Sequence, residues 1–229
     1  VYINNVEVFR PFLVRSGQQE GLSVINPYMV DKIGFSTGGY AAKYGDKMSS
    51  ALDITYKTLK AKSKKPVVEG SLAASLLGAD AYIGLGTQKL SWLNSVRYKT
   101  TSYLLGSMET KGEYKPNYLD YQTYLSYQPN KRWKLDFIGY ISDNHYNFEP
   151  EDRETKFGTM ENVKSFRVYF DGQEKDRFLT YFGTLGITRQ FTANTSLSLL
   201  GSAFYTKEQE KYDIQGQYWL DETETSENL

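Results

Sequence analysis

The 229-residue sequence contains no cysteine and a single histidine, His145. The absence of cysteine excludes disulfide frameworks, thiolate zinc sites and cysteine nucleophiles. No apolar run approaches the ~20 residues that a membrane-spanning helix needs. Basic and acidic residues both number 27, so the formal net charge is zero. A chain without net charge or a basic tail has no electrostatic footprint for nucleic acid, and we expect no nucleic-acid partner.

Catalytic and metal-binding patterns are also missing. No G-x-S-x-G motif accompanies His145, which favours a surface histidine over a catalytic one. The acidic residues Glu149, Glu151, Asp152 and Glu154 lack the spacing of a calcium-binding loop and are typical of a solvated loop. The sequence therefore predicts no enzymatic activity, no cofactor and no metal site.

Tyrosine is abundant, with 20 residues beside 12 Phe and 3 Trp. Aromatic residues favour β-strands in general. They also form the girdles of outer-membrane barrels, where each ring has one apolar and one wet end. Composition alone leaves both interpretations open. The mean hydropathy of −0.55 is equally ambiguous, because the polar lumen face of a barrel lowers this value.

From Val67 onward apolar and polar residues alternate, which is the pattern of half-buried β-strands. Most segments are about ten residues long, the length that a tilted strand needs to cross a bilayer. The alternation is broken at Leu77, Ile138, Leu200 and Phe204, and no helical period competes. The expected antiparallel strands are 67–77, 79–86, 91–99, 119–128, 132–143, 178–190 and 195–207.

The connections between these strands alternate between short and long, apart from a tight turn at Gly78. Short polar connections are expected at 87–90, 129–132 and 191–194. Long ones are expected near 100–118 and 144–177, and residues after 207 are expected to form a further outer loop and the start of another strand. Outer-membrane barrels have this pattern, because short turns face the periplasm and long loops face outward.

Residues 1–57 have shorter strands and irregular connections. Asn4-Asn5 between Val1-Tyr2-Ile3 and Val6-Glu7-Val8 predicts a tight hairpin, since Asn tolerates positive φ. A loop is expected over 10–27, and strands over 29–36 and 48–56. The lysine-rich segment 58–66, TLKAKSKKP, is expected to be a solvated linker.

The stretch 30–57, VDKIGFSTGGYAAKYGDKMSSALDITYK, resembles the end of the plug domain of TonB-dependent outer-membrane receptors, in the form seen among Bacteroidetes. INPYMVDKI, which overlaps its start, is similar to the family's approach to this segment. The motif residues are Gly38, Gly39, Tyr44 and Gly45, and the glycines are expected to allow tight turns with positive φ.

The resemblance implies an all-β chain with three parts. Residues 1–57 are the C-terminal part of a plug domain, 58–66 a linker, and 67–229 the N-terminal strands of an outer-membrane β-barrel. The family's barrel has about 22 strands around a plugged lumen. Because about seven strands cannot close such a barrel, we expect this chain to be a fragment of a longer one.

The implied function is energy-coupled uptake of an unidentified ligand across the bacterial outer membrane. Its implied partners are outer-membrane lipid, the remainder of the barrel, and TonB acting through an N-terminal segment outside this sequence. Whether a surface lipoprotein caps the barrel stays open. Candidate ligand-facing loop residues are Tyr103, Tyr114, Tyr118, His145, Tyr146 and Phe148, although an outer aromatic girdle or packing between loops would use the same residues.

Two alternatives remain at this point. A barrel of the same build can have a structural role in a larger surface or secretion assembly. A soluble β-sandwich binding module is the third reading. A barrel predicts that apolar strand residues face outward in one band, whereas a sandwich buries them in an enclosed core. The residues that separate these readings are Leu135, Phe137, Leu185, Ile187, Leu197 and Leu199.

Overall fold

The fold comes from a computed structural model of the chain. It describes residues 1–8, 23–38, 41, 43–45, 49–100, 112–159 and 163–223. The chain divides into two compact units. The first comprises Val1–Lys99, Tyr118–Asn144 and Phe178–Lys207, and the second comprises Thr100–Asn117, His145–Arg177 and Glu208–Leu229. The second unit thus collects the segments that the sequence places between or after the predicted strands.

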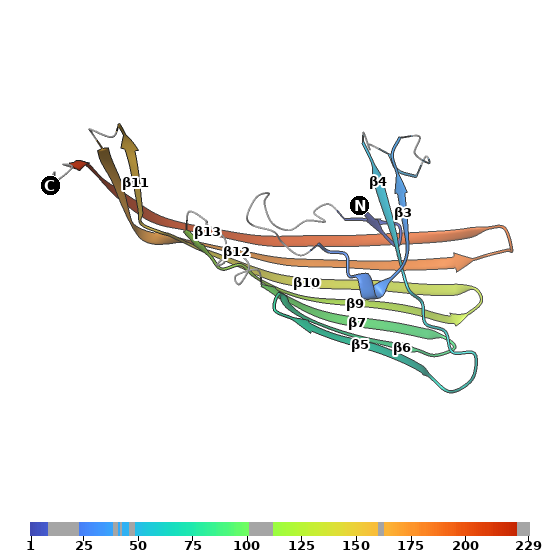
Figure 1. Ribbon diagram of the computed structural model, residues 1–229. Coiled ribbons are helices and arrows are strands. Elements are labelled where there is room, and N and C mark those ends of the chain that lie inside the picture. Colours follow the sequence, from blue (N-terminus) through green and yellow to red (C-terminus); the bar gives the residue numbers. More distant parts are fainter. Residues whose placement is uncertain are drawn as a thin grey trace. The chain divides into compact units, whose positions relative to one another are not determined.

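Residues 1–57, hereafter the N-terminal region, form a small sheet of four strands in the order β2-β1-β4-β3, of which Figure 1 labels β3 and β4. The strands are β1 (Tyr2–Ile3), β2 (Val6–Glu7), β3 (Val30–Ser36) and β4 (Ala51–Tyr56), and a 3-10 helix (Pro27–Met29) precedes β3. Asn4 and Asn5 have φ values of 48° and 67°, which confirms the predicted hairpin turn. β1 runs parallel to β4, so the hairpin extends the β3–β4 sheet.

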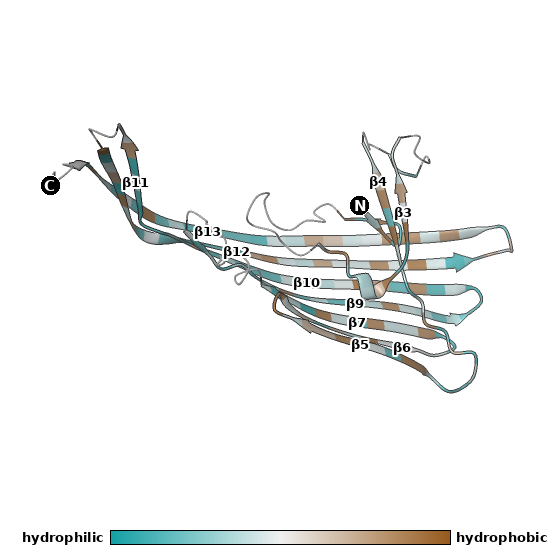
Figure 2. Ribbon diagram, in the orientation of Figure 1, coloured by the Kyte–Doolittle hydropathy of each residue, from teal (hydrophilic) through white to brown (hydrophobic). Residues whose placement is uncertain are grey.

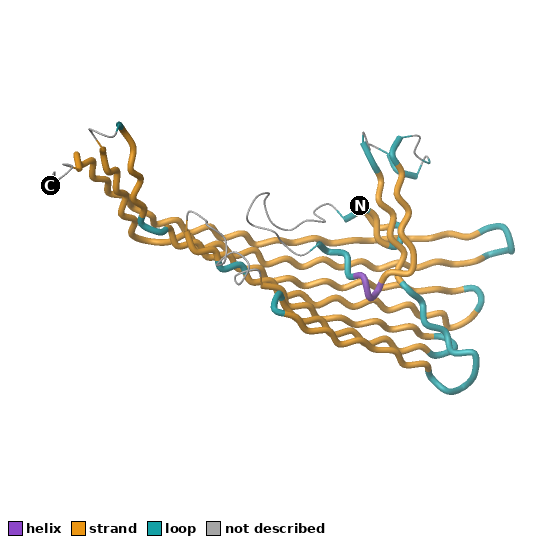
Figure 3. The backbone as a smooth tube through the Cα atoms, in the orientation of Figure 1, coloured by secondary structure: helices purple, strands orange, loops and turns teal. Residues whose placement is uncertain are grey.

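The strands after the linker form a larger antiparallel sheet, which within the first unit curls like half of a barrel. Its seven main strands follow one another in chain order from β5 to β13, as the tube in Figure 3 traces. Two short strands, β8 (Gly112–Tyr114) and β11 (Arg153–Gly158), pair with β10 and β12. The all-β fold with about seven antiparallel strands is therefore confirmed. The main strands are β5 (Val67–Ser75), β6 (Gly78–Gly86), β7 (Leu90–Thr100), β9 (Asn117–Asn130), β10 (Trp133–Pro150), β12 (Val163–Gln190) and β13 (Ser196–Thr223).

The tight turn between β5 and β6 depends on Gly78. Its φ is +146°, a conformation that L side chains rarely adopt. A Cβ atom at this position would lie 2.1 Å from the backbone oxygen of Tyr98 in β7. Gly78 therefore both makes the turn and lets β7 approach it, as the predicted turn at this residue requires.

Most apolar side chains of the alternating pattern lie on the exposed face of the sheet. Figure 2 shows the resulting alternation of hydrophobic and hydrophilic residues along each strand. Of the six residues chosen above to separate a barrel from a sandwich, none is buried. Leu135 and Ile187 are half-buried, while the other four are exposed, Leu199 by as much as 71%. These apolar side chains do not converge on an enclosed core.

The opposite face of the sheet is covered in part by the N-terminal region and buries polar side chains. An apolar patch on the same face completes the contact, because Ile138 and the half-buried Phe204 pack against the core that includes Ile3, Val6 and Ile54. Two of the interruptions in the alternating pattern are thus explained by this contact. The buried polar residues are Ser91, Ser95, Arg97, Asp120, Gln122, Ser126, Ser142, Asn144, Thr180 and Thr184.

The long connections expected near 100–118 and 144–177 consist mostly of strand in the described residues. β10 continues to Pro150, β12 begins at Val163, and β11 pairs with it to extend the sheet. β13 likewise continues to Thr223 instead of ending near residue 207. These extensions carry charged residues that pair across neighbouring strands, for example Glu154 and Arg167 at 3.6 Å. Without an apolar face they show no period-two signal, although ladder hydrogen bonds hold them as strands.

The first half of the lysine-rich linker is packed against β6 and β7, contrary to the expectation of a solvated connection. The backbone N–H of Leu59 donates to Ser91 Oγ at 2.9 Å, and that of Ala61 donates to the oxygen of Thr87 at 3.2 Å. A Cβ at Gly84 or Gly86 would lie within 2.7 Å of Leu59. The two glycines therefore make room for the linker.

Within the described residues, no helix combines the length and hydropathy needed to span a bilayer.

Candidate functional site

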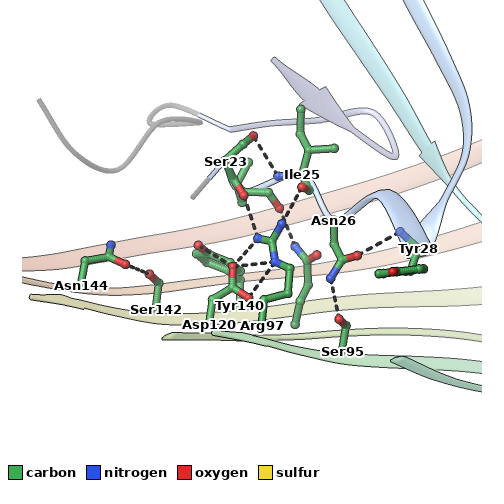
Figure 4. Close-up of polar contacts among 12 residues, drawn as sticks. Ser23, Ile25, Asn26, Tyr28, Ser95, Arg97, Asp120, Tyr140, Ser142 and Asn144 are labelled. Atoms are coloured by element: carbon green, nitrogen blue, oxygen red, sulfur yellow. Dashed lines mark hydrogen bonds and ion pairs between the residues drawn. The ribbon is translucent and has the colours of Figure 1, made fainter. Parts of the chain in front are cut away.

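The polar face of the sheet contains a buried ion pair between Arg97 of β7 and Asp120 of β9 (Figure 4). Arg97 Nε lies 3.0 Å from Asp120 Oδ1 and 3.1 Å from Oδ2, and Nη2 also donates to Oδ2. The side chain of Arg97 is 6% exposed and that of Asp120 is fully buried. Burying such charges costs several kcal/mol per ion unless the pair and its remaining donors are all bonded.

The remaining donors of Arg97 bind the backbone of the N-terminal region. Nη2 donates to the carbonyl oxygen of Ser23 at 2.7 Å, and Nη1 donates to that of Ile25 at 2.9 Å. Between them, the carbonyl of Val24 accepts from Gln122 Nε2 at 3.1 Å. Three consecutive carbonyls are thus held by two strand side chains. Because every residue has a carbonyl, this contact recognises the path of the backbone instead of particular side chains.

Asn26 continues the contact by one residue. Its Oδ1 accepts from the backbone N–H of Tyr28 at 3.0 Å, which caps the 3-10 helix. Its Nδ2 donates to Ser95 Oγ on β7. Asn26 is completely buried, so both functions of the amide are protected from water. One side chain therefore fixes the local turn and joins it to the sheet.

The same polar row continues on β10. The Tyr140 hydroxyl lies 3.5 Å from Asp120 Oδ2, and Ser142 Oγ donates to Asn144 Oδ1 at 3.1 Å. All three β10 residues are buried. The row of polar side chains therefore extends beyond the residues that contact segment 23–26.

Tyr44, a residue of the G-G/Y-G motif, ties the segment before β4 to that strand. Its hydroxyl donates to Asp53 Oδ2, which Lys43 Nζ also contacts at 2.7 Å. The Tyr44 ring lies 5.1 Å from the ring of Tyr2. Burial raises the pKa of Asp53, but the hydrogen bonds from Lys43 and Tyr44 outweigh it and leave that pKa below the ordinary 3.8. The hydrogen bond to Asp53 raises the pKa of Lys43 to about 12.

The motif glycines behave differently from one another. Gly38 has φ +76°, as predicted for a tight turn. Gly45 does not have a positive φ, so that expectation is wrong, and a Cβ at Gly45 would meet no atom within 4 Å. Gly39 lies outside the described residues.

A polar cavity of about 370 Å³ lies between the N-terminal region and the sheet. Two ion pairs line it, Lys43 with Asp53 and Lys134 with Asp136, the latter at 2.8 Å. Hydroxyl groups also line it, together with a few apolar side chains such as Val6, Ile138 and Leu200; the hydroxyl-bearing residues include Thr55, Thr58, Thr184, Thr188 and Ser198. Such a lining favours water and small polar solutes over apolar ones.

The structure brings together three of the predicted ligand-facing residues, in the second unit. The ring of Tyr114 stacks on Phe148 at 4.5 Å and lies 6.1 Å from that of Tyr146. Burial and the nearby Glu174 carboxylate raise the pKa of Tyr114. His145 is exposed and alternates in β10 with the buried Tyr146, so its side chain is on the other face of the strand.

Tyr118, another predicted ligand-facing residue, does not join this aromatic cluster. Tyr118 is 1% exposed within β9 of the first unit, so its assignment to a loop is wrong. Its place in the alternating pattern of β9 puts it on the buried face of the strand. Tyr103 lies outside the described residues.

The residues of the buried polar contact were not among those predicted as functional. Their signal in the sequence was the occurrence of Arg97, Asp120 and Gln122 at polar positions of predicted strands, where Ser and Thr are otherwise common. Opposite charges in neighbouring strands indicate a pair, but the sequence did not indicate that residues 23–25 would be its other partner.

Among the described residues, no group of three or more His, Asp or Glu side chains is arranged to bind a metal ion. The carboxylates of the acidic segment are instead distributed among separate partners, with Glu149 near Lys115 and Asp152 accepting from the backbone of Phe170. Comparison with protein-family models, with curated proteins and with solved structures found no match to this chain.

Proposed function

We propose that this chain is part of a TonB-dependent outer-membrane receptor, with a plug end followed by the first barrel strands, for energy-coupled uptake of an unidentified ligand. The observation that carries the proposal is the orientation of the sheet. Its polar face buries Arg97, Asp120 and Gln122 against the N-terminal region, while Leu185, Leu197 and Leu199 are exposed on the other face. A soluble protein rarely exposes so continuous an apolar surface, whereas a barrel in lipid requires one.

Closure of the barrel is part of the proposal. Among the described strands, β5 and β13 each have a partner on one side only. An unpaired strand edge in lipid costs several kcal/mol for each unbonded backbone group. The proposal therefore includes further strands beside both β5 and β13, supplied by the same receptor.

The contact with segment 23–26 has a defined role in this proposal. Arg97 and Gln122 hold the plug backbone on one side of the lumen, and the motif residue Tyr44 holds a second segment through Asp53. Ligand would bind on the extracellular side, and force applied through TonB would move the parts of the plug that lack such contacts. The polar cavity beside Lys43 and Lys134 is compatible with passage of a polar solute.

A structural barrel in a surface or secretion assembly is the second candidate, favoured by one observation. The bonds from Arg97 and Gln122 to three consecutive carbonyls would equally keep a lumen closed permanently. Energy coupling separates the two functions. The uptake proposal expects a strain without the receptor and a strain without TonB to share one growth defect on a panel of glycans, siderophores, peptides and cofactors. A defect in surface assembly that does not depend on TonB supports the structural candidate.

The membrane position is tested with single cysteines in the full-length receptor, since this part of it has none of its own. Leu199 and Ser198 are neighbours on β13 that are both exposed but point to opposite faces. In membranes, the spin relaxation of a nitroxide label at Leu199→Cys should be accelerated by oxygen, which concentrates in lipid. A water-soluble nickel chelate should have little effect on this label. The matched label at Ser198→Cys should show the reverse. A nickel-accessible label at position 199 contradicts the proposal.

A further inference from the structure

An apolar groove crosses the exposed face of the sheet between β9 and β13. It has a volume of about 420 Å³ and its lining is almost entirely apolar. Gly139 of β10 and Gly183 of β12 leave the space open, and aromatic rings such as Tyr181 and Tyr205, 6.4 Å apart, flank it. Glycine inside a strand weakens it and often marks a place where a ligand approaches closely.

Crowding does not explain the glycine at position 183. A Cβ there would meet one atom, the oxygen of Ile138, at 3.9 Å, which is an ordinary contact. Its φ lies outside the positive range, so the backbone does not require glycine either. The remaining explanation is the groove itself, because a larger side chain at position 183 would occupy it.

A cluster of cations lies at the turn end of the same strands. Arg189 is exposed between two aromatic rings, with its guanidinium carbon 5.0 Å from the centre of Trp133 and 4.8 Å from that of Phe191. In the described part of the chain Arg189 forms no ion pair, and neither do the exposed Lys131 and Arg132. The sequence from 178 to 207 contains no acidic residue at all.

The chemistry of this cluster fits a phosphate. Rings that contact the face of a guanidinium leave its N–H groups free at the edge, where they can donate to phosphate oxygens in a bidentate manner. Trp and Arg at the boundary of a barrel's apolar band are also where lipid head groups lie. The phosphate of a phospholipid can therefore serve as the counter-ion of the Arg189 guanidinium.

The distance between cation and groove matches one leaflet. Trp133 precedes Gly139 by six residues in β10, and Gly183 precedes Arg189 by six residues in β12. Six residues span roughly 20 Å along a strand, or about 14 Å along the membrane normal at a tilt of ~45°. Half of the ~30 Å hydrocarbon core is about the same length.

We propose that this face binds a phospholipid of the periplasmic leaflet, with its phosphate at Arg189 and an acyl chain in the groove at Gly139 and Gly183. The proposal rests on the membrane position given under the proposed function, together with the expectation that the short connections at 129–132 and 191–194 face the periplasm. A phospholipid unites the two observations, because it carries an anion and an apolar chain at the required separation.

Native mass spectrometry of the full-length receptor in detergent tests this site, with dioleoylphosphatidylglycerol as the probe and dioleoylglycerol, which lacks the phosphate, for comparison. The wild type should retain one phosphatidylglycerol per chain. Gly183→Leu should lose it at a lipid concentration that saturates the wild type. Gly201→Leu is the matched control. Gly201, in β13, lies on the same face of the sheet as Gly183 but does not line the groove, and a Cβ there would meet no atom within 4 Å. Arg189→Gln should weaken phosphatidylglycerol binding about tenfold, as expected for a charge-assisted hydrogen bond, without changing dioleoylglycerol binding.

Equal binding by Gly183→Leu and Gly201→Leu, or an unchanged affinity in Arg189→Gln, overturns the proposal. If the wild type is a dimer and Gly183→Leu is a monomer, a second copy of the receptor, not lipid, occupies the groove. Circular dichroism of each variant shows that it has folded. The labels at positions 198 and 199 separate the two levels of inference. If the label at 199 lies in lipid but no phosphatidylglycerol is retained, only the lipid site is wrong; if that label is accessible to water, the membrane position itself is wrong.

Discussion

Replacing Arg97 by Met should release segment 23–26 from the sheet. The substitution keeps much of the side-chain volume but removes the bonds to the carbonyls of Ser23 and Ile25 and leaves Asp120 buried without its charge partner. Removing one member of a buried pair costs about 3–5 kcal/mol. Even the lower value corresponds to a more than hundredfold larger open population, since 1.4 kcal/mol is a factor of ten.

Hydrogen exchange of the full-length receptor measures this population directly. The amides of residues 23–29 should exchange about a hundred times faster in Arg97→Met than in the wild type, because opening of this segment limits their exchange. Gln122→Leu is the matched comparison. It removes a single neutral hydrogen bond to Val24, worth about 1 kcal/mol, so its acceleration should be about fivefold.

The double variant Arg97→Met/Asp120→Leu completes the experiment. With both charges removed, the buried carboxylate no longer lacks a partner, and exchange should slow relative to Arg97→Met alone. Two results would contradict this role of the ion pair: equal effects of Arg97→Met and Gln122→Leu, or faster exchange in the double variant than in Arg97→Met alone. Either result would mean that the ion pair does not hold the segment.

Three further predictions concern the rest of the chain. Gly86→Val should destabilise the packed linker by about 1–3 kcal/mol, because a Cβ there lies 2.7 Å from the backbone of the linker. Gly201→Val should have little effect, and chemical denaturation of both variants measures the difference in stability. Asp53→Asn should destabilise the motif contact by less than about 1 kcal/mol at pH 7, since the contact is partly exposed. Because the folded-state pKa of Asp53 is lowered, its contribution to stability is fully present above pH 3.8 and is lost as the pH falls through the lowered pKa. Below that pH, amide hydrogens of the wild type and of the variant should exchange at equal rates. Tyr114→Ala should speed exchange in 112–114 by up to about tenfold, because a stacked aromatic pair contributes about 1 kcal/mol.

Several predictions from the sequence were confirmed because they depend on local rules. The turn at Gly78 and the hairpin at Asn4-Asn5 follow from which residues tolerate positive φ. The main strands follow from the period of two, and the outward position of Leu199 follows from the same alternation. Such features are encoded within a few neighbouring residues, so one sequence suffices to read them.

The predictions that failed needed knowledge of more distant residues. The segment after Asn144 and the first residues after Lys207 were expected to be loops because their charges interrupt the apolar alternation, yet pairing with a neighbouring strand keeps them extended. Tyr118 was expected in a loop for a similar reason. Its burial in β9 is a consequence of the strands around it, which the sequence near Tyr118 does not describe.

The sequence by itself determined an all-β chain whose strands have one apolar and one polar face, and its alternating pattern also set the order of those strands. Tertiary structure alone decided which face is covered and by what. Arg97 and Asp120 are separated by 23 residues, and their carbonyl partners lie more than 70 residues from Arg97. A buried charge is stable only when all its partners arrive together, and that coincidence exists only after the N-terminal region has packed on the sheet.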